Sequence, residues 1–341
     1  MKNKKDFLTL FVSFFLVLML ILFSGKAKAG ALSGFNLAVN AIIPSLLPVM
    51  IIFSAVTNSS CNNLISKMFS KITTKIFKLP SSCASTIIFG LIGGYPTGCL
   101  LCKELLDKKA ISKNQARRIM EFNVNGGIAF TVTAVGTSLL NNTKAGWILF
   151  FSTTVSALMI CLFRAIFCKK EKIENLNTVC NTDFSVAIQT GCKNSVSATL
   201  NMTAFIMLFS AFMNIFDIPK NILPLLEITN GLFSLKEIRL EYMAFFLAFG
   251  GFCIHLQLYP IICEFKMKYA RFLLFRVIHA FLSFFVCKLL LLAFPVCKSV
   301  FSNISQTTAE PFTVNAAFCF LMIFGCIVFI FDLKNKKHII G

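Results

Sequence analysis

Few residues of this 341-residue chain could do chemistry inside its long apolar stretches, and the sharpest candidate is Glu227. It stands among Leu225, Leu226 and Ile228, where a lone carboxylate is so costly to bury that it must be protonated, paired or turned toward water. An acid in such a place could couple the movement of a proton or cation, or accept a hydrogen bond from a ligand. The alternative is a loop-end acid at the outer surface, since Pro219 lies close by in the sequence.

Other polar side chains lie in similar apolar surroundings. His255 could relay protons near neutral pH, or it could simply donate to a neighbouring carbonyl. Gln257 lies two residues further on, so the two share a helical face only if the helix is distorted there. Asn123 and Asn125 could bind a ligand or satisfy a broken backbone, and Tyr95 could stack on a ring or sit at the membrane interface.

Enzymatic and metal chemistry find little support in the sequence. It has no Ser/His/Asp order with supporting glycine turns, no H-E-x-x-H and no phosphate loop, so we expect no enzyme. The 14 cysteines are scattered, and Cys99 and Cys102 form a lone C-x-x-C without a second pair or a nearby histidine. We therefore interpret the cysteines as small apolar side chains and expect neither a metal nor a cofactor.

Breaks in the apolar stretches are the strongest pointer to a site. Residues 89–102 read FGLIGGYPTGCLLC, in which glycines and a proline interrupt the run. Inside a helix a glycine costs about 1 kcal/mol and a proline about 3 kcal/mol relative to alanine. A bilayer tolerates unpaired backbone groups only where protein or a water-filled cavity satisfies them. The break therefore predicts either a small polar cavity or a hinge and close helix contact without a ligand.

Similar breaks recur at FNVNGG, LEITNG and GGFCIHLQ, and together they favour the cavity. The predicted ligand-binding residues all lie in these breaks: Gly93, Gly94, Tyr95, Pro96, Thr97, Gly98, Asn123, Asn125, Gly126, Glu227, Thr229, Asn230, Gly250, Gly251, His255 and Gln257.

The composition defines the elements that must position these residues. The chain is 57% hydrophobic and 14% charged, it has 40 Phe, and its mean hydropathy is +0.79. These values predict an all-α polytopic membrane protein, integral to the cell membrane. The net charge of +19 suits basic cytoplasmic loops against anionic lipid. We expect the lipid bilayer and a small polar solute as partners and no nucleic acid; the oligomeric state stays open.

The apolar segments that could span the membrane are 7–24, 35–57, 83–102, 122–140, 145–168, 184–216, 222–235, 242–262, 272–295 and 312–333. The first is interpreted as a retained helix; cleavage at Ala27-Lys28-Ala29 is the alternative. Residues 61–78 predict an amphipathic helix with a basic face, lying on the cytoplasmic leaflet. Ser112 and Gln115 are spaced as a capping box for a short helix.

Two matches between the halves indicate a duplication. Residues 51–56 (IIFSAV) parallel 207–212 (MLFSAF), and 89–95 (FGLIGGY) parallel 246–252 (FLAFGGF), at nearly the same spacing. We divide the chain into an N-terminal segment 1–30, a first repeat 31–172 and a second repeat 173–341. The linker 61–82 is basic and 213–241 is slightly acidic, which favours inverted repeats. The count of crossings then requires 83–102 or 122–140 to re-enter.

The motifs SLLPVMIIFS, GLIGGYPTG, FNVNGGIAF, LLEITNG and FGGFCIHLQ, in this order, resemble the YlbJ-type sporulation integral membrane proteins. The resemblance runs from about Phe35 to His279, and the family belongs to the nucleoside-recognition, or Gate, domain group. It implies two Gate-like repeats with a transporter-like fold. It also implies a role in building the spore envelope and cortex, from a membrane of the developing cell.

Three functions follow as hypotheses. The first is a sporulation membrane protein that binds or moves a small solute. The second is a transporter of nucleosides or other metabolites, unrelated to sporulation. The third is a membrane scaffold with a vestigial cavity, which recruits spore-envelope machinery.

Overall fold

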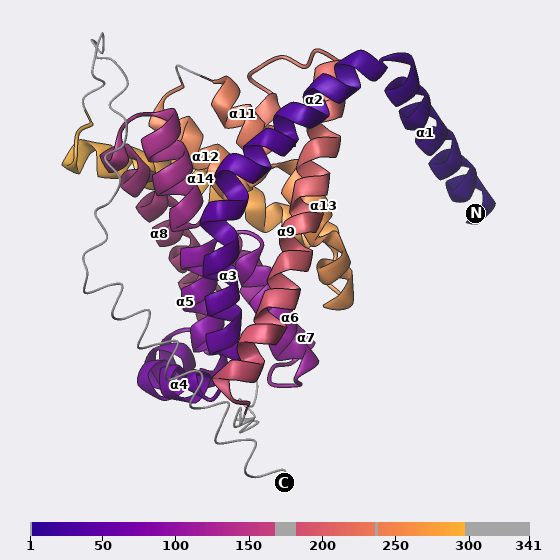
Figure 1. The fold of residues 1–341 in the computed structure, drawn as a ribbon. Coiled ribbons are helices and arrows are strands. Elements are labelled where there is room, and N and C mark those ends of the chain that lie inside the picture. The colour runs from indigo at the N-terminus through magenta and orange to yellow at the C-terminus, as the bar shows by residue number, and fades with distance from the viewer. Residues whose placement is uncertain (1, 168–181, 236–237, 297–341) are drawn as a thin grey trace.

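The computed structural model describes residues 2–167, 182–235 and 238–296, and these form helices without a strand (Figure 1). Five helices are long and apolar enough to cross a membrane, and a bent pair would make a sixth. The protein is therefore an all-α, multi-pass membrane protein, as the composition predicts. The expected span 312–333 lies outside the described residues.

In chain order the helices of the first half are α1 (Lys2–Leu22), α2 (Ser24–Leu37), η1 (Ala38–Ile42), α3 (Ile43–Asn58), α4 (Cys61–Lys71), η2 (Ile72–Ile76), η3 (Ser81–Cys83), α5 (Ala84–Gly93), α6 (Thr97–Asp107), α7 (Lys113–Phe122), η4 (Ala129–Leu139) and α8 (Thr143–Phe167). Those of the second half are α9 (Phe184–Ile215), α10 (Leu223–Leu226), α11 (Ile228–Ser234), α12 (Leu240–Phe249), α13 (Gly251–Glu264) and α14 (Tyr269–Ala293).

Helices α2, η1 and α3 form one continuous span, Ser24–Asn58, longer than the predicted 35–57. The tripeptide Ala27-Lys28-Ala29 lies inside this helix, with Ala27 packed against Ala211 of α9. Helix α1 precedes it and projects away from the body of the molecule (Figure 1). The apolar side chains of α1 are exposed, which suits contact with lipid.

The span Ser24–Asn58 packs antiparallel on α9 through two close approaches. At one end, a Cβ on Gly34 would lie 2.7 Å from Oγ of Ser210. At the other end, a Cβ on Gly191 would lie 3.3 Å from Cβ of Ser54. Each helix thus presents a glycine to a serine of its partner, and the missing side chains let the backbones come together.

The two glycine–serine pairs differ in sequence spacing by one residue: Gly34 precedes Ser54 by 20 positions, and Gly191 precedes Ser210 by 19. The π-helical turn η1, Ala38–Ile42, lies inside the longer interval. A π turn accommodates one extra residue within a helix. The turn therefore keeps Ser54 and Ser210 at matching positions along their helices.

Helices α5 and α6 form a hairpin. The start of α5 is tied to α4, since Oγ of Ser85 donates to Oδ1 of Asn62 at 2.7 Å. The second half of α6 is tied to the end of α3, since Nδ2 of Asn58 donates to Glu104 at 2.6 Å. Helix α5 therefore begins, and α6 ends, near the corner between α3 and α4. The chain reverses between them at residues 94–96. Of the two runs proposed for re-entry, 83–102 is the one that folds as a helical hairpin.

The run 122–140 takes a different path. Helix α7 begins at the predicted capping box, in which Ser112 and Gln115 exchange both hydrogen bonds. It is followed by the irregular segment 123–128 and then by η4, which packs along α8. Helices α12 and α13 follow one another in the same direction and form a single 25-residue span. The break between them lies at Gly250 and Gly251, which have φ of 89° and 73°.

The amphipathic helix predicted over 61–78 is observed as α4 and η2. Its apolar residues Leu64 and Met68 stay exposed, and so do Lys67 and Lys71 on the basic face. Such a helix leaves an apolar stripe uncovered by the protein, as expected for a helix that lies on a membrane surface. It lies at one end of the molecule, and α11 lies at the opposite end (Figure 1).

Candidate solute-binding cavity

The breaks of the chain meet around one small cavity. Gly93 and Tyr95 reach it from the tip of the α5–α6 hairpin, and Gly127 from the segment before η4. Glu227 reaches it from the break between α10 and α11, and Gln257 from α13. Apolar residues complete the wall: Ile42, Leu46, Phe130, Met202, Ile206, Ile228 and Ile254.

The cavity is small. The space open to the centre of a water-sized sphere is ≈ 20 Å³. A buried water needs about 10–15 Å³ by the same measure, so one water fits and a nucleoside does not. The described conformation is therefore closed around its centre.

Glu227 is the acidic group of this wall. Its side chain is 1% exposed, which rules out a place at an exposed loop end. Oε1 accepts the backbone N–H of Thr229 at 2.8 Å, and Oε2 accepts that of Asn230 at 2.7 Å. The carboxylate thus caps the N-terminus of α11, where free N–H groups favour a negative charge. It serves as a helix cap and faces the cavity at the same time.

Tyr95 connects two of the breaks. Its hydroxyl donates to the carbonyl of Leu247, near the end of α12, at 2.5 Å, and its backbone N–H donates to the carbonyl of Asn125 at 2.9 Å. The ring is buried, so it does not sit at the membrane interface. Tyr95 holds the hairpin tip, the segment 123–128 and α12 together.

The two asparagines differ in how they are bonded. Nδ2 of Asn123 donates to the carbonyl of Thr86 at 2.9 Å, so this side chain satisfies the backbone of α5. Asn125 is fully buried, and neither its amide nitrogen nor its amide oxygen has a hydrogen-bond partner among the described residues. Leaving such a group unsatisfied costs about 1–3 kcal/mol, so Asn125 is a costly part of this segment.

His255 supports a break and does not line the cavity. Its Nε2 lies 3.0 Å from the carbonyl oxygen of Phe249, and its Nδ1 lies 3.1 Å from the hydroxyl of Tyr269. Because a carbonyl only accepts, Nε2 carries the proton and Nδ1 accepts from the tyrosine. This is the simpler of the two roles expected for the residue: it satisfies the carbonyl freed where α12 ends.

Of the predicted ligand-binding residues, the structure places at the cavity Gly93, Tyr95, Glu227, Thr229 and Gln257. The others do not line it, and they lie in the surrounding breaks: Gly94, Pro96, Thr97, Gly98, Asn123, Asn125, Gly126, Asn230, Gly250, Gly251 and His255. The polar amide of Gln257 faces the cavity side of α13, and Nε2 lies 3.2 Å from Sγ of Cys253.

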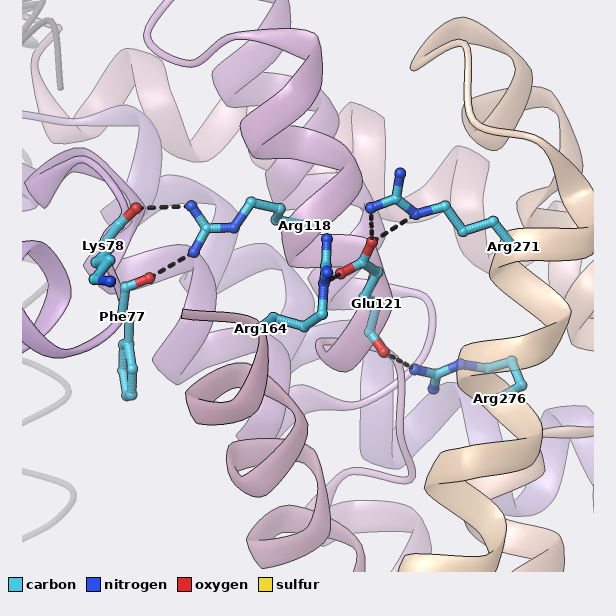
Figure 2. Close-up of polar contacts among 7 residues, drawn as sticks. All are labelled: Phe77, Lys78, Arg118, Glu121, Arg164, Arg271 and Arg276. Carbon is cyan, nitrogen blue, oxygen red and sulfur yellow. Dashed lines mark hydrogen bonds and ion pairs between the residues drawn. The ribbon is translucent and has the colours of Figure 1, made fainter. Parts of the chain in front are cut away.

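A network of arginines around the buried Glu121 positions the segment 123–128, and the sequence analysis overlooked it (Figure 2). The carboxylate of Glu121, fully buried, receives Nε of Arg164 at 2.6 Å and Nε of Arg271 at 2.8 Å. Arg276 donates to the backbone carbonyls of Glu121, at 2.6 Å, and of Val124. The segment that carries Asn125 is thereby held by α14.

Arg118 extends this network on its other side (Figure 2). Its guanidinium donates to the carbonyls of Phe77 at 2.7 Å and of Lys78 at 2.8 Å, just before the hairpin begins. One signal in the sequence could have revealed the network: Arg276 interrupts the apolar run 272–295, and charges inside membrane helices are paired or functional.

Comparison with protein-family models, with curated proteins and with solved structures finds no match. The architecture itself therefore defines the class: an all-α, multi-pass membrane protein whose broken helices surround a small cavity.

Proposed function

We propose that this protein binds a small polar solute in the cavity and moves it across the membrane. The observation that carries the proposal is the meeting of breaks from both halves of the chain at one small cavity. Broken backbone at membrane depth is stable only around a cavity or buried in protein, and broken helices of duplicated units form the sites of many transporters.

We also propose that the two halves are inverted, Gate-like repeats, as this function would require. Gly34 meets Ser210, and Gly191 meets Ser54, as an approximate two-fold axis between the helices would require. Each serine also contacts the second helix of a helical pair: Ser54 contacts Glu104 of α6, and Ser210 contacts Asn230 of α11. On this basis we propose that α10–α11 corresponds to the α5–α6 hairpin, and the break at 250–251 to the one at 123–128. This correspondence replaces the match of 89–95 with 246–252 that the sequence suggested.

We further propose that the protein acts in a membrane of a sporulating cell, in the formation of the spore envelope and cortex. The support is the ordered set of motifs that resembles the YlbJ-type proteins. Transport of a nucleoside or other metabolite without a role in sporulation is the alternative within the same class of mechanism.

One observation favours a scaffold with a vestigial cavity as the second candidate. The space of ≈ 20 Å³ holds little more than a water, and both oxygens of Glu227 already cap α11. If the protein moves a solute, the walls must separate to admit it.

The test replaces the chromosomal gene of a spore-forming strain with Glu227→Gln and counts heat-resistant spores, with membrane abundance measured by blot. Glu264→Gln is the matched control, because this acid is exposed at the far end of α13. We expect Glu227→Gln to lose resistant spores at normal abundance and the control to keep them. Normal spores from Glu227→Gln beside a failing deletion would favour the scaffold. Normal spores from the deletion would contradict the role in sporulation. The remaining hypothesis would then be a metabolite transporter unrelated to sporulation.

A further inference from the structure

We propose that two polar side-chain clusters, one toward each end of α9, are the gates that seal the cavity from the two sides of the membrane. The inference rests on the proposed transport function and assigns residues to the opening steps that it requires. It concerns side chains that the cavity itself does not contain.

Three hollows follow one another along α9. An inner hollow, on the side of α4 and α6, is lined by Asn194 and Asn201 of α9. The cavity is lined by Met202 and Ile206, and an outer hollow, on the side of α11, by Ser210 and Asn214. At 1.5 Å per residue, the distance from Asn194 to Asn214 is about 30 Å, the thickness of the hydrocarbon core of a bilayer.

The hollows differ in size and openness to water. The space that water-sized spheres can occupy is ≈ 20 Å³ in the cavity, ≈ 410 Å³ in the inner hollow and ≈ 360 Å³ in the outer hollow. Water can therefore fill both end hollows, and a solute that reaches either one has only a short barrier to cross. The basic α4 assigns the inner hollow to the cytoplasmic side.

The outer gate is the contact of Asn230 with Ser210. Nδ2 of Asn230 donates to Oγ of Ser210, and both residues line the outer hollow. Gly34 packs against the same serine, so α2, α9 and α11 all meet there. The backbone N–H of Asn230 is bound by Glu227, and a change at this cavity carboxylate would therefore move the gate.

The inner gate is the cluster around Glu104. Its carboxylate accepts Oγ of Ser54 at 2.9 Å, Nδ2 of Asn58 at 2.6 Å and Nδ2 of Asn194 at 2.9 Å. These bonds tie α6 to α3 and to α9 beside the inner hollow. Gln257 lines both this hollow and the cavity, and so forms the partition between them.

Both gates are suited to opening because each lies beside a hollow that water can fill. Breaking the neutral bond between Asn230 and Ser210 costs about 0.5–1.5 kcal/mol once water replaces the lost partner. The bonds to the Glu104 carboxylate are worth about 1.5–3 kcal/mol each, so the inner gate is the stronger of the two. The caps that hold Glu227 are backbone bonds inside the wall and lack this freedom. Ser54 and Ser210 stand at matching positions, so each end of the protein has one gate of its own.

The test follows a thiol in the cavity wall, Ile206→Cys, in sealed vesicles of each orientation. A membrane-impermeant thiol reagent is added from one side, and labelling is measured peptide by peptide by mass spectrometry. The native Cys192, exposed near the inner end of α9, reports the rate of an open position when the reagent is added from the inner side. Asn230→Ala is compared with Glu104→Ala, and Ser210→Ala with Ser54→Ala as milder changes that preserve folding.

We expect Asn230→Ala and Ser210→Ala to speed labelling of the introduced thiol at least tenfold from the outer side only. Glu104→Ala and Ser54→Ala should do so from the inner side only. Unchanged protection in all four variants, or labelling from both sides in any one of them, would overturn the gates. Leu46→Cys, on the neighbouring helix α3, repeats the measurement with a second reporter.

This readout needs no solute, so it separates the two proposals. Side-specific labelling with normal spores from Glu227→Gln would keep the gates and remove the proposed function. Full protection with loss of spores from Glu227→Gln would keep the function and remove the gates.

Discussion

Two segments share the pattern of a phenylalanine followed four and five residues later by a pair of glycines, yet they fold differently. At 89–95 the helix stops at Gly93 and the chain turns back as α6. At 246–252 it stops at Phe249 and continues across the membrane as α13. The glycine pair thus determines that a helix breaks, while the direction after the break depends on the neighbours.

The neighbours differ in what they offer to the returning chain. After the first break, Gly98 lets α6 pack directly on Asn123, because a Cβ there would lie 2.3 Å from the carbonyl oxygen of Asn123. After the second break, His255 binds the carbonyl of Phe249 and keeps α13 in line with α12. At the first break, close packing of α6 on the backbone of Asn123 permits the reversal. At the second break, the hydrogen bond of His255 to Phe249 maintains the direction.

Arg276→Leu should give the largest effect, because Arg276 holds the buried backbone against which the first break packs. It removes the donors to the carbonyls of Glu121 and Val124, each of which costs about 1–3 kcal/mol when left unsatisfied. We expect a large loss of thermal stability in detergent, measured by fluorescence-detected size exclusion after heating. The control is the exposed Arg239→Leu, which loses only its ion pair with Glu241 and should lower the stability less. Equal stability of both variants would contradict the role of the network.

Exchange of the second glycine in each pair compares the two breaks directly. Gly94 has φ 78° and a Cβ there would lie 2.1 Å from the backbone nitrogen of Gly127, whereas at Gly251 (φ 73°) the nearest atom would be 3.2 Å away. Alanine costs about 1–2 kcal/mol at either position through the backbone. Gly94→Ala should lose about 1–3 kcal/mol more through overpacking. Equal apparent melting temperatures would show that the approach to Gly127 relaxes freely.

His255→Ala should weaken only the second break. It leaves the carbonyl of Phe249 without its partner and should cost about 1–3 kcal/mol. The expected result is a lower melting temperature, with labelling of the cavity thiol in the Ile206→Cys background still protected from both sides. His255→Gln, which restores a donor, is the rescue variant. A loss of function at full stability would instead assign His255 a role in the chemistry of the site.

Tyr95→Phe should give the smallest effect, and it tests the link between the two breaks. The hydroxyl of Tyr95 belongs to the first break, and its acceptor, the carbonyl of Leu247, precedes the second. Loss of this one neutral hydrogen bond should cost about 1 kcal/mol. The melting temperature should fall by less than in His255→Ala, while spore counts and membrane abundance stay normal. A collapse of abundance would mean that the two breaks depend on each other far more than one bond explains.

Much of the local structure is readable from residue types. Apolar composition predicts the all-α membrane class, and Ser112 with Gln115 predicts the start of α7, because both depend on neighbours in sequence. The glycines predict the breaks for the same reason. Two roles could not be read so directly: Glu227 is a helix cap as well as a cavity residue, and His255 is a prop. Each depends on which backbone group the folded chain brings within reach.

The sequence by itself determined where helices can form and where they must stop, since propensity, capping and the cost of burying polar groups act over a few residues. Only the tertiary structure decided that α5 and α6 turn back, that residues from both halves surround one cavity, and that Glu121 gathers arginines from α8 and α14. These outcomes depend on which distant surfaces fit without a Cβ and which buried charges find partners. That information lies in contacts between segments far apart in the chain, and no local pattern carries it.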